Sequence, residues 1–499
     1  MCSGKGNLGK ISGSSECFSS VIPRSLLRGA SLTSTWGKQL AGSSDRRVLV
    51  VAYYFPPILT SGAFRPAAFC RHLRKYGWLP RILTVDPNSV DPPLGVDENL
   101  SRNLPVDLQI DRVAHPSPIQ TFIRLRDRLK RMTHIQGDRT NASKTTRARG
   151  QADPRLLSRM FAKWTDLTLD WLLTFPDPQS YWRQPAIRRL GDLLMHERPM
   201  LVYATGGPWT SLLVGEQLAR QWRVPFVADF RDPWSRNPNQ EGRSSVLAKK
   251  VKALEERVCR SAAAVIANTV ELQGCFIEDY PYLKDKFVTI TNGFDQQTLP
   301  HGDRARNPTS TSVGLELCHF GTVYTGRNPL ELFRAIKELS TERRCEPGQL
   351  RLRFVGLWQV DDDRVEALAQ DLEKQGYLCR DPPVPHDVCL QQMLAVSVLL
   401  AIQPDYPLQI PGKIFEYIAT GRPLLIIGGA GATSQLVERH GLGKCCLNRV
   451  YEIKQLLLGL LEKREPFPSP AQQQIERFNY SALTGELARL FDRVCHDNY

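Results

Sequence analysis

The chain has 499 residues, of which 42% are hydrophobic, and it carries a formal net charge of +14. This length exceeds that of one ordinary domain, and this composition can bury large apolar cores, which excludes a globally disordered chain. No apolar stretch is long enough for a transmembrane helix and no secretory signal is recognisable, so we expect a cytoplasmic protein. The twelve cysteines form neither a CxxC pair nor a Cys/His cluster, so we expect reduced thiols and no zinc site.

The positive charge is concentrated in two segments. Residues 1–47 contain seven Lys and Arg against two Asp and Glu, and residues 111–163 contain thirteen against four. Because the rest of the chain is neutral, a nucleic-acid-binding core is not expected, and the basic segments are interpreted as attachments to a neutral enzyme. Residues 1–46, which are rich in Gly and Ser and lack apolar periodicity, are predicted to be a disordered tail.

Residues 47–296 alternate short apolar runs with helical patterns. The β-branched run at 47–52 predicts a buried strand, and a turn-rich loop, a helical pattern and a second strand at 80–85 follow it. Such a strand, helix and strand unit is typical of a parallel sheet, so we predict a Rossmann-like N-terminal domain. Further strands of this domain are expected at 201–204, 225–228, 263–267 and 288–291.

A basic segment at about residues 111–165 interrupts this domain. Phe122, Leu125 and Leu129 recur at helical spacing, with basic residues between them. A basic amphipathic helix of this kind can lie on an anionic membrane surface, which would place the protein peripherally on the inner face of the membrane. The alternative is a solvated charged face that packs on its own domain.

The second half of the chain repeats the alternation of strands and helices. We predict an α/β fold class, with a second Rossmann-like domain over residues 297–470 and a helical segment over residues 471–499. Strands are expected at 315–320, 352–355, 398–402 and 424–427, and helices at 329–339, 363–375 and 413–420.

The loop after the first predicted strand contains a glycine that is a candidate ligand contact. Gly62 would let the backbone approach a ligand closely, and the amides at the start of the following helix can face a phosphate. The alternative is an ordinary turn between a strand and a helix. The chain has no GxGxxG after this strand and no GxxxxGK[ST] anywhere, which argues against a dehydrogenase and a P-loop enzyme.

Three charged residues, Asp229, Arg231 and Asp232, follow the predicted strand at 225–228. Open parallel sheets place their ligand contacts at the carboxyl ends of strands. Clustered charges there are costly unless they are paired or functional, so we select these three residues as catalytic candidates. The alternative is an ion pair between Arg231 and one of the aspartates that only fixes the loop.

Two segments of the second half have the composition of an anion site. Gly321, Tyr324 and Arg327 lie between a predicted strand and a helix, where glycines, a cation and a helix N-terminus suit a diphosphate. Lys413 and Glu416 share one face at the start of another helix, where a lysine opposes the helix dipole unless an anion binds. The alternatives are a glycine turn with the arginine in solvent, and a Lys–Glu surface pair.

Six segments in this order resemble the family 4 retaining glycosyltransferases, and the likeness is to bacterial enzymes that build surface polysaccharides. The resemblance extends over roughly residues 47 to 490. It rests on residues 50–57 with Gly62, Arg65 and Pro66, and on residues 205–208, 228–234, 292–295, 321–326 and 411–417.

The resemblance implies a GT-B fold, in which two Rossmann-like domains with parallel sheets face a central cleft. The acceptor would bind the N-terminal domain, and the last helix would cross back to that domain. On this acceptor side the candidate residues are Phe64, Arg65, Gly206 and Gly207.

On the donor side, the resemblance assigns Glu416 to the ribose of the nucleotide, and Arg327 and Lys413 to its diphosphate. It also implies an enzyme without metal or other cofactor. One residue departs from the family pattern, because Leu408 stands where the family has a glutamate that faces the donor sugar. The alternatives are a substitute from the neighbouring loop, such as Asp405, or a loss of catalysis.

The resulting hypothesis is a hexosyltransferase that moves a sugar from a nucleotide diphosphate sugar to a glycan or lipid-linked acceptor, with retention, in polysaccharide biosynthesis. Asp229 or Asp232 would orient the acceptor, and the leaving phosphate oxygen would take the acceptor proton in a front-face attack. Two alternatives stay open. One is a GT-B-fold nucleotide-sugar epimerase, and the other is a catalytically inactive scaffold that assembles polysaccharide enzymes at the membrane.

Overall fold

The computed structural model describes residues 46–90, 93–116, 175–191, 198–237, 245–298, 314–403, 406–464, 466–468 and 470–497. The predicted tail lies outside these ranges apart from Arg46, and so does the predicted basic insert after residue 116. The membrane interpretation of that insert, and Asp405 as a substitute carboxylate, therefore concern residues outside the described ranges. None of the described helices is long and apolar enough to cross a membrane.

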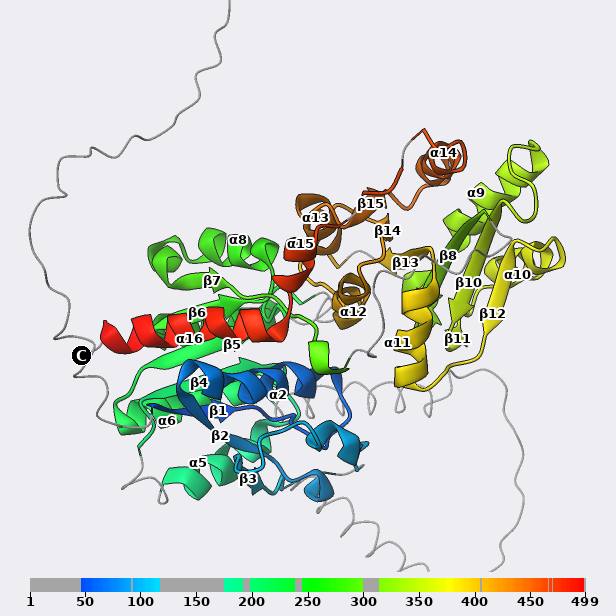
Figure 1. Cartoon of the computed structure of the whole chain (residues 1–499). Helices are drawn as coiled ribbons and strands as arrows, with labels where there is room; N and C mark the ends of the chain where they lie inside the picture. The colour runs from blue at the N-terminus through cyan, green and yellow to red at the C-terminus, as the bar shows by residue number, and fades with distance from the viewer. Residues whose placement is uncertain are drawn as a thin grey trace, which may run out of the picture. The chain divides into compact units, whose positions relative to one another are not determined.

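The first sheet contains seven parallel strands in the order β3-β2-β1-β4-β5-β6-β7 (Figure 1). The order reverses between the neighbours β1 and β4, and open sheets of this kind bind ligands at such a reversal, beyond the carboxyl ends of the strands. The strands are β1 (Arg46–Val51), β2 (Trp78–Val85), β3 (Gln109–Val113), β4 (Leu201–Gly206), β5 (Phe226–Phe230), β6 (Ala264–Ala267) and β7 (Phe287–Thr289).

The edge strand β3 is not predicted by the sequence analysis. It pairs in parallel with β2, so residues 111–113, which we assigned to the basic insert, belong to the sheet. Its buried Asp111 pairs with Arg81 of β2, with Nε and Oδ2 2.7 Å apart. An edge strand is only partly buried and carries charged residues, so β3 lacks the apolar pattern by which strands are predicted from a sequence.

Helices cover both faces of the first sheet. Helices α2 (Ser61–Leu73) and α16 (Tyr480–His496) lie side by side on one face (Figure 1). Leu483, Leu487 and Phe491 of α16 recur at helical spacing and are buried in a core that includes side chains of β1 and β4. The last helix of the chain is therefore part of the core of the first sheet. The other face is covered by α5 (Arg183–Gly191), α6 (Thr210–Trp222), α7 (Ser245–Ser261) and α8 (Val270–Asp279).

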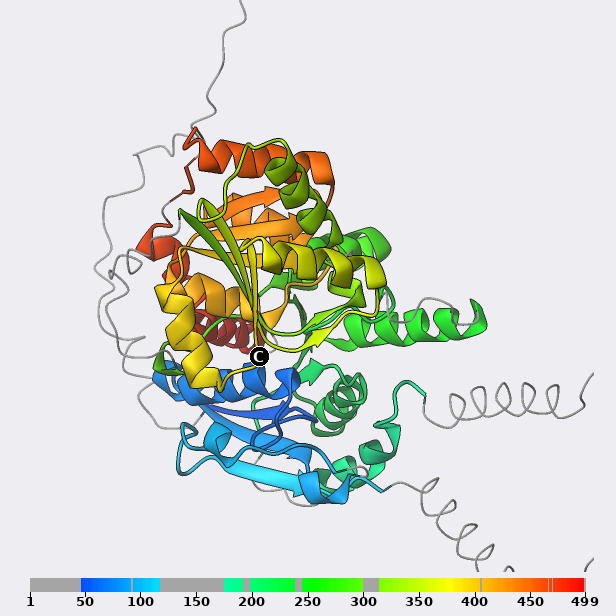
Figure 2. The same ribbon diagram turned by 90° about the vertical axis from the view of Figure 1, so that its right-hand side faces the viewer.

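The second sheet contains six parallel strands in the order β12-β10-β8-β13-β14-β15 (labelled in Figure 1 and seen from another side in Figure 2). Its strands are β8 (Leu315–Phe320), β10 (Leu350–Val355), β12 (Leu378–Asp381), β13 (Val398–Gln403), β14 (Leu424–Gly428) and β15 (Gly443–Cys446). One face packs against α9 (Leu330–Thr341), α10 (Asp363–Lys374) and α14 (Val450–Leu461). The other face packs against α11 (His386–Ala395), α12 (Gly412–Thr420) and α13 (Ala432–Arg439).

The prediction of an α/β fold with two parallel sheets is confirmed. The edge strands β12 and β15 are the elements of the second sheet that the sequence analysis does not predict. Each has four residues, LCRD and GKCC, and neither contains a β-branched residue. The compositional signal for a strand is therefore missing at both edges of this sheet.

The chain leaves the first sheet and returns to it through two segments that lie against each other. The amide of Phe294, after β7, donates to the carbonyl of Phe478 at 3.0 Å, and the amide of Tyr480 donates to the carbonyl of Phe294 at 2.9 Å. A Cβ at Gly293 would lie 2.4 Å from the carbonyl oxygen of Phe478, so only glycine permits this approach. We refer to residues 293–294 and 478–480 as the crossing pair.

Candidate functional site

Lys413 lies at the start of helix α12 and reaches the end of strand β8. Its Nζ atom donates to Nε2 of His319 at 3.0 Å and to the carbonyl oxygen of Phe320 at 3.3 Å. One turn later on α12, the hydroxyl of Tyr417 accepts a hydrogen bond from the Phe320 amide at 2.8 Å. Apolar residues of α12, among them Ile414, are buried against the second sheet. This packing holds the lysine at the carboxyl end of β8.

The surroundings of Lys413 disfavour its charged form. Burial, and after it the positive charge of Arg327, lower the pKa of Lys413 to about 7. Burial, followed by the charge of Lys413, lowers the pKa of His319 well below its usual range, so this imidazole is neutral. An anion bound beside Lys413 and Arg327 would relieve the repulsion between the two cations.

Arg327 approaches the same place from the loop after β8. It ends the short 3-10 helix η9 (Thr325–Arg327), and its guanidinium carbon lies 5.3 Å from the centre of the Tyr324 ring. Its Nε atom is buried and has no hydrogen-bond partner among the described residues, which is costly. Gly321 has a φ of +113°, and a Cβ there would lie 3.7 Å from Nζ of Lys413. The structure thus brings together Gly321, Tyr324, Arg327 and Lys413, which the sequence assigns to the donor.

Glu416 lies on the same helix, almost one turn beyond Lys413. Its Oε1 atom is 3.1 Å from Nε2 of His386, the first residue of α11. This hydrogen bond raises the pKa of His386, whose side chain is 66% exposed. A ribose hydroxyl that binds Glu416 would therefore compete with His386 for the same oxygen.

The guanidinium of Arg231 fills a space that two glycines leave open. Arg231 directly follows β5, and its Nη2 atom donates to the carbonyl of Gly207. A Cβ at Gly62 would lie 2.6 Å from Nη1 of Arg231, and a Cβ at Gly207 would lie 2.9 Å from Nη2. Gly62 and Gly207 therefore both leave room for the guanidinium of Arg231, and the assignment of Gly62 to the donor stays a prediction.

Asp232 is the accessible carboxylate of this motif, because 38% of its side chain is exposed. Its Oδ2 atom lies 3.5 Å from Nε of Arg231, and its Oδ1 atom accepts a hydrogen bond from Nε2 of Gln409 at 3.0 Å. Gln409 precedes α12, so this bond connects the motif after β5 with the segment that leads to Lys413. Asp232 keeps its place as a candidate contact for an acceptor.

Asp229 and Arg65 form a buried ion pair, with 0% and 1% of their side chains exposed. Arg65 donates from Nε and Nη2 to the two carboxylate oxygens, each at 2.9 Å, and the hydroxyl of Tyr203 donates to Oδ2 at 2.6 Å. Arg65 also donates to the carbonyls of Ile290 and Thr291, after β7. No acceptor can reach either side chain. We therefore correct the catalytic assignment of Asp229 and the acceptor-side assignment of Arg65: both hold α2, β5 and the segment after β7 together.

The two other acceptor-side candidates differ in accessibility. Phe64 lies on α2 and is 44% exposed. Gly206 ends β4, and a Cβ there would lie 2.9 Å from Leu212 and 3.0 Å from Trp209. Gly206 therefore allows α6 to pack closely on the sheet, and its assignment to the acceptor side stays a prediction.

Leu408 is the residue that departs from the family pattern. Its side chain packs against the core of the first sheet, and its carbonyl accepts a hydrogen bond from Oγ1 of Thr269 at 2.9 Å. Position 408 therefore supplies an apolar contact to the first sheet in place of a carboxylate.

The sequence analysis misses three polar residues of this region, His319, His386 and Gln409. His319 has a signal, because a histidine in the apolar second half of a strand, two residues before a glycine, needs a hydrogen-bond partner when it is buried. His386 and Gln409 have none, because their partners are 30 and 177 positions away in the sequence.

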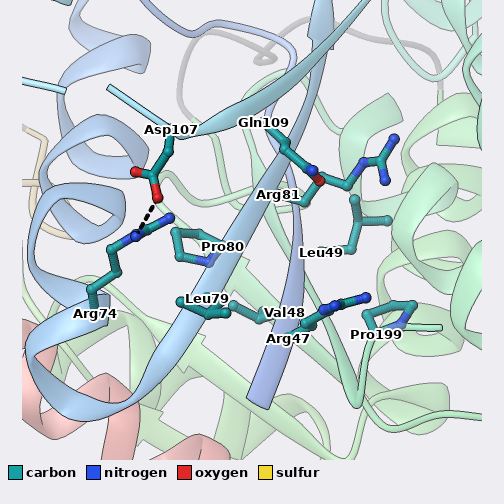
Figure 3. A pocket seen from close by; sticks show the side chains of 10 residues that line it. All are labelled: Arg47, Val48, Leu49, Arg74, Leu79, Pro80, Arg81, Asp107, Gln109 and Pro199. Carbon is teal, nitrogen blue, oxygen red and sulfur yellow. Dashed lines mark ion pairs between the residues drawn. The ribbon is translucent and has the colours of Figure 1, made fainter. Parts of the chain in front are cut away.

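Two cavities lie apart from these residues. One cavity of about 320 Å³ opens at the amino ends of β1 and β2, whereas the candidate residues lie at the carboxyl ends of strands. It includes Arg74, whose Nη1 atom lies 2.6 Å from Oδ2 of Asp107 (Figure 3). The other, of about 700 Å³, is lined by β14, β15, α13 and α14 and includes neither Arg327 nor Lys413. Within the described ranges, no group of three or more His, Cys, Asp and Glu residues is arranged to hold a metal ion.

The comparison with protein families concerns the first sheet and its helices. Residues 63–293 match the family model described as a glycosyl transferase 4-like domain. The chain contains a glycosyl transferase 4-like domain. This domain includes Arg231 and Asp232, whereas Arg327, Lys413 and Glu416 follow it in the chain.

Solved structures share the architecture of most of the chain. The HepE protein of Anabaena, in complex with UDP and glucose, matches over 90% of this chain and 100% of its own, with 15% identity and a TM-score of 0.51. Sucrose-phosphate synthase from Thermosynechococcus elongatus matches over 90% and 99%, with 13% identity and a TM-score of 0.56. The apo form of WaaB, a lipopolysaccharide outer core galactosyltransferase, matches over 90% and 99%, with 10% identity and a TM-score of 0.51.

Identities this low establish the fold alone, and the predicted GT-B fold is confirmed. None of the curated protein sequences compared with the chain matches it. The glycosyl transferase 4-like domain is therefore identified by its family model, and the GT-B fold by the solved structures.

Proposed function

We propose that this chain is a retaining hexosyltransferase that takes a sugar from a nucleotide diphosphate sugar and transfers it to a glycan or lipid-linked acceptor. The observation that carries the proposal is the pair of cations, Arg327 and Lys413. The charge of Arg327 acts on Lys413, and Nε of Arg327 is buried without a partner in the described part of the chain. Glu416, the nearby carboxylate, is hydrogen-bonded to His386. A diphosphate would supply negative charge and hydrogen-bond acceptors to both cations.

The diphosphate is also the leaving group of such a transfer. Arg327 and Lys413 would stabilise the charge that develops on its leaving oxygen, and Glu416 would bind ribose hydroxyls. In a front-face attack the same oxygen takes the proton of the acceptor hydroxyl, so that no side chain acts as the nucleophile. Asp232, with Arg231 beside it, would orient the acceptor. Because the two cations supply the positive charge, we propose a reaction without a metal ion or other cofactor.

We place this reaction in polysaccharide biosynthesis, at the inner face of the membrane. WaaB, a neighbour in fold, is a lipopolysaccharide outer core galactosyltransferase. The positive charge of residues 111–163 suits a surface of anionic lipid. Flotation with anionic phospholipid vesicles tests the membrane assignment, with neutral vesicles as the control. Failure to bind the anionic vesicles would contradict it.

A screen of nucleotide sugars by thermal shift tests the donor, because a ligand that binds only the folded state raises its melting temperature. UDP sugars come first, since the HepE neighbour contains UDP and glucose. We expect one nucleoside diphosphate series to stabilise the protein. Products are then analysed with and without acceptor. Conversion of the sugar without acceptor would indicate an epimerase, and donor binding without transfer or hydrolysis would indicate an inactive scaffold.

A further inference from the structure

His319 holds the amine of Lys413 through a chain of two hydrogen bonds. It lies in β8 with 1% of its surface exposed, and its Nδ1 atom is 3.1 Å from the carbonyl oxygen of Leu400 in β13. A carbonyl accepts only, so Nδ1 must carry the imidazole proton and donate it. The neutral ring then presents the lone pair of Nε2 to Nζ of Lys413, 3.0 Å away. The neighbouring strand thereby fixes the tautomer that can accept from the lysine.

The groups that face the lysine come from four elements. β8 contributes the neutral imidazole of His319, the segment η9 contributes the positive charge of Arg327, and α11 contributes Cys389. On α12 itself, Glu416 acts on the lysine from a distance while its Oε1 is hydrogen-bonded to His386. Within the described ranges, the contacts of Nζ itself are therefore two neutral acceptors, the imidazole and a carbonyl.

A neutral acceptor has a consequence that a carboxylate in the same place would not have. A carboxylate would keep the lysine permanently charged and would cancel that charge before a ligand arrived. An imidazole nitrogen can accept a hydrogen bond from an ammonium and also, more weakly, from an uncharged amine. The buried amine can therefore lose its proton in the empty site and regain it beside an anion, without losing its hydrogen bond to His319.

We propose that His319 is a positioning residue of the donor site: its Nε2 atom holds the amine of Lys413 in place, and the amine takes up one proton from solvent when a nucleoside diphosphate binds. This inference rests on the proposed function, because it assumes that the diphosphate binds beside Lys413 and Arg327. Burial and the charge of Arg327, which lower the pKa of Lys413 to about 7, agree with it.

Titration calorimetry measures this proton directly. UDP is titrated into the full chain at pH 8, in buffers that differ in ionisation enthalpy, and the slope of the observed enthalpy against the buffer enthalpy gives the number of protons taken up. At pH 8 a phosphate monoester with a pKa near 6 is already ionised, so UDP itself contributes little. A lysine whose pKa is lowered to about 7 is then mostly neutral before binding, and we expect the uptake of most of one proton.

The substitution Lys413→Arg tests the source of the proton. A guanidinium stays charged at pH 8, so this variant should bind UDP with no proton uptake. Binding of UDP by the natural chain without uptake, or an undiminished uptake in Lys413→Arg, would overturn the inference.

The substitutions His319→Gln and His319→Asn form a matched pair that tests positioning without placing an apolar residue in a polar site. A glutamine carries its oxygen near the place of Nε2 and can accept from Lys413, whereas an asparagine mimics Nδ1 and is too short to reach the amine. We expect the Kd for UDP to stay within about threefold in His319→Gln and to rise about tenfold in His319→Asn. Equal Kd values in two variants with equal melting temperatures would contradict a positioning role.

The same titrations separate this inference from the proposed function. If UDP, GDP and ADP all fail to bind or to stabilise the natural chain, the proposed donor site is wrong and the inference falls with it. If one of them binds without proton uptake, the donor site stands and only the role of Lys413 and His319 is refuted.

Discussion

At Glu416 the carboxylate that we assign to the ribose is already hydrogen-bonded to a titratable partner. His386 lies 3.1 Å away, and this contact raises the pKa of its imidazole. The pair is strongest while His386 is protonated, below that raised pKa, and it weakens as the pH rises through it. Donor binding has to break this pair, so a stronger pair between Glu416 and His386 weakens the binding of the donor.

Protonation of His386 should therefore raise the KM for the donor as the pH falls, whereas protonation of Lys413 should lower it, so the natural chain is compared with His386→Asn at each pH. Because the side chain of His386 is 66% exposed, the contact is weak, and the ratio of KM in the natural chain to KM in the variant should rise about two- to fivefold at acid pH. Initial rates between about pH 5 and 8, with saturating acceptor, measure it, because histidine titrates in that range. A ratio that does not change with pH would contradict this role of His386.

The buried pair of Arg65 and Asp229 predicts an effect on stability. Arg65→Met would leave an unpaired carboxylate with no exposure to solvent, which costs about 3–5 kcal/mol of unfolding free energy. The matched control is Arg74→Met, because Arg74 pairs with Asp107 at the surface and such pairs contribute at most about 1 kcal/mol. Urea denaturation of both variants measures the difference. Similar losses in the two would contradict our account of the buried pair.

The sequence shows which residues follow a strand but not what covers them. It places Asp229 directly after the predicted strand, whereas in the structure Asp229 is the fourth residue of β5, and Arg65, which neutralises it, is 164 positions away. Lys413 and Arg327 are predictable because each lies beside a glycine at an element boundary. His386 and Gln409 are not predictable, because only the packing of distant elements brings them to Glu416 and Asp232.

At the scale of elements, the strands with apolar runs are predictable and the polar edges are not. VLVV in β1 and AVIA in β6 carry the composition of buried strands, since both faces of a parallel sheet are covered. β3, β12 and β15 contain charged or small residues, because an edge strand is paired on one side only. The helices are found more readily, since their apolar positions repeat every three or four residues.

Helix α2 offers a test of how an element boundary controls the site. Gly62→Ala improves the intrinsic helix propensity by about 1 kcal/mol, but its Cβ would lie 2.6 Å from Nη1 of Arg231 and must displace the guanidinium. We expect kcat/KM to fall about tenfold or more with little change in melting temperature. Gly274→Ala, inside α8 and with nothing within 4 Å of the new Cβ, is the matched control and should leave kcat/KM unchanged. An equal loss in both variants would exclude displacement of Arg231 as the cause.

At the scale of the whole molecule, the last helix stabilises the first sheet. Leu487 of α16 is fully buried, so Leu487→Ala should reduce the unfolding free energy by about 2–5 kcal/mol. Arg489→Ala, on the exposed side of the same helix, should change it by no more than about 0.5 kcal/mol. Chemical denaturation followed by tryptophan fluorescence reports the first sheet, because Trp78 lies in the same apolar core as Leu487. A denaturation curve that Leu487→Ala leaves unchanged would contradict the prediction that the last helix stabilises the first sheet.

The crossing pair has a consequence for how the protein is made on the ribosome. The first sheet is complete when β7 has been synthesised, at Thr289, but part of one of its apolar faces, beside α2, is covered by a helix that begins only at Tyr480. At ordinary rates of translation that part of the face waits roughly 10–40 s for α16. Throughout this interval the nascent chain presents a surface that chaperones bind and that neighbouring chains can aggregate on. Yield in the cell should therefore depend on how quickly α16 leaves the ribosome, even though this helix contains none of the residues that we assign to the donor.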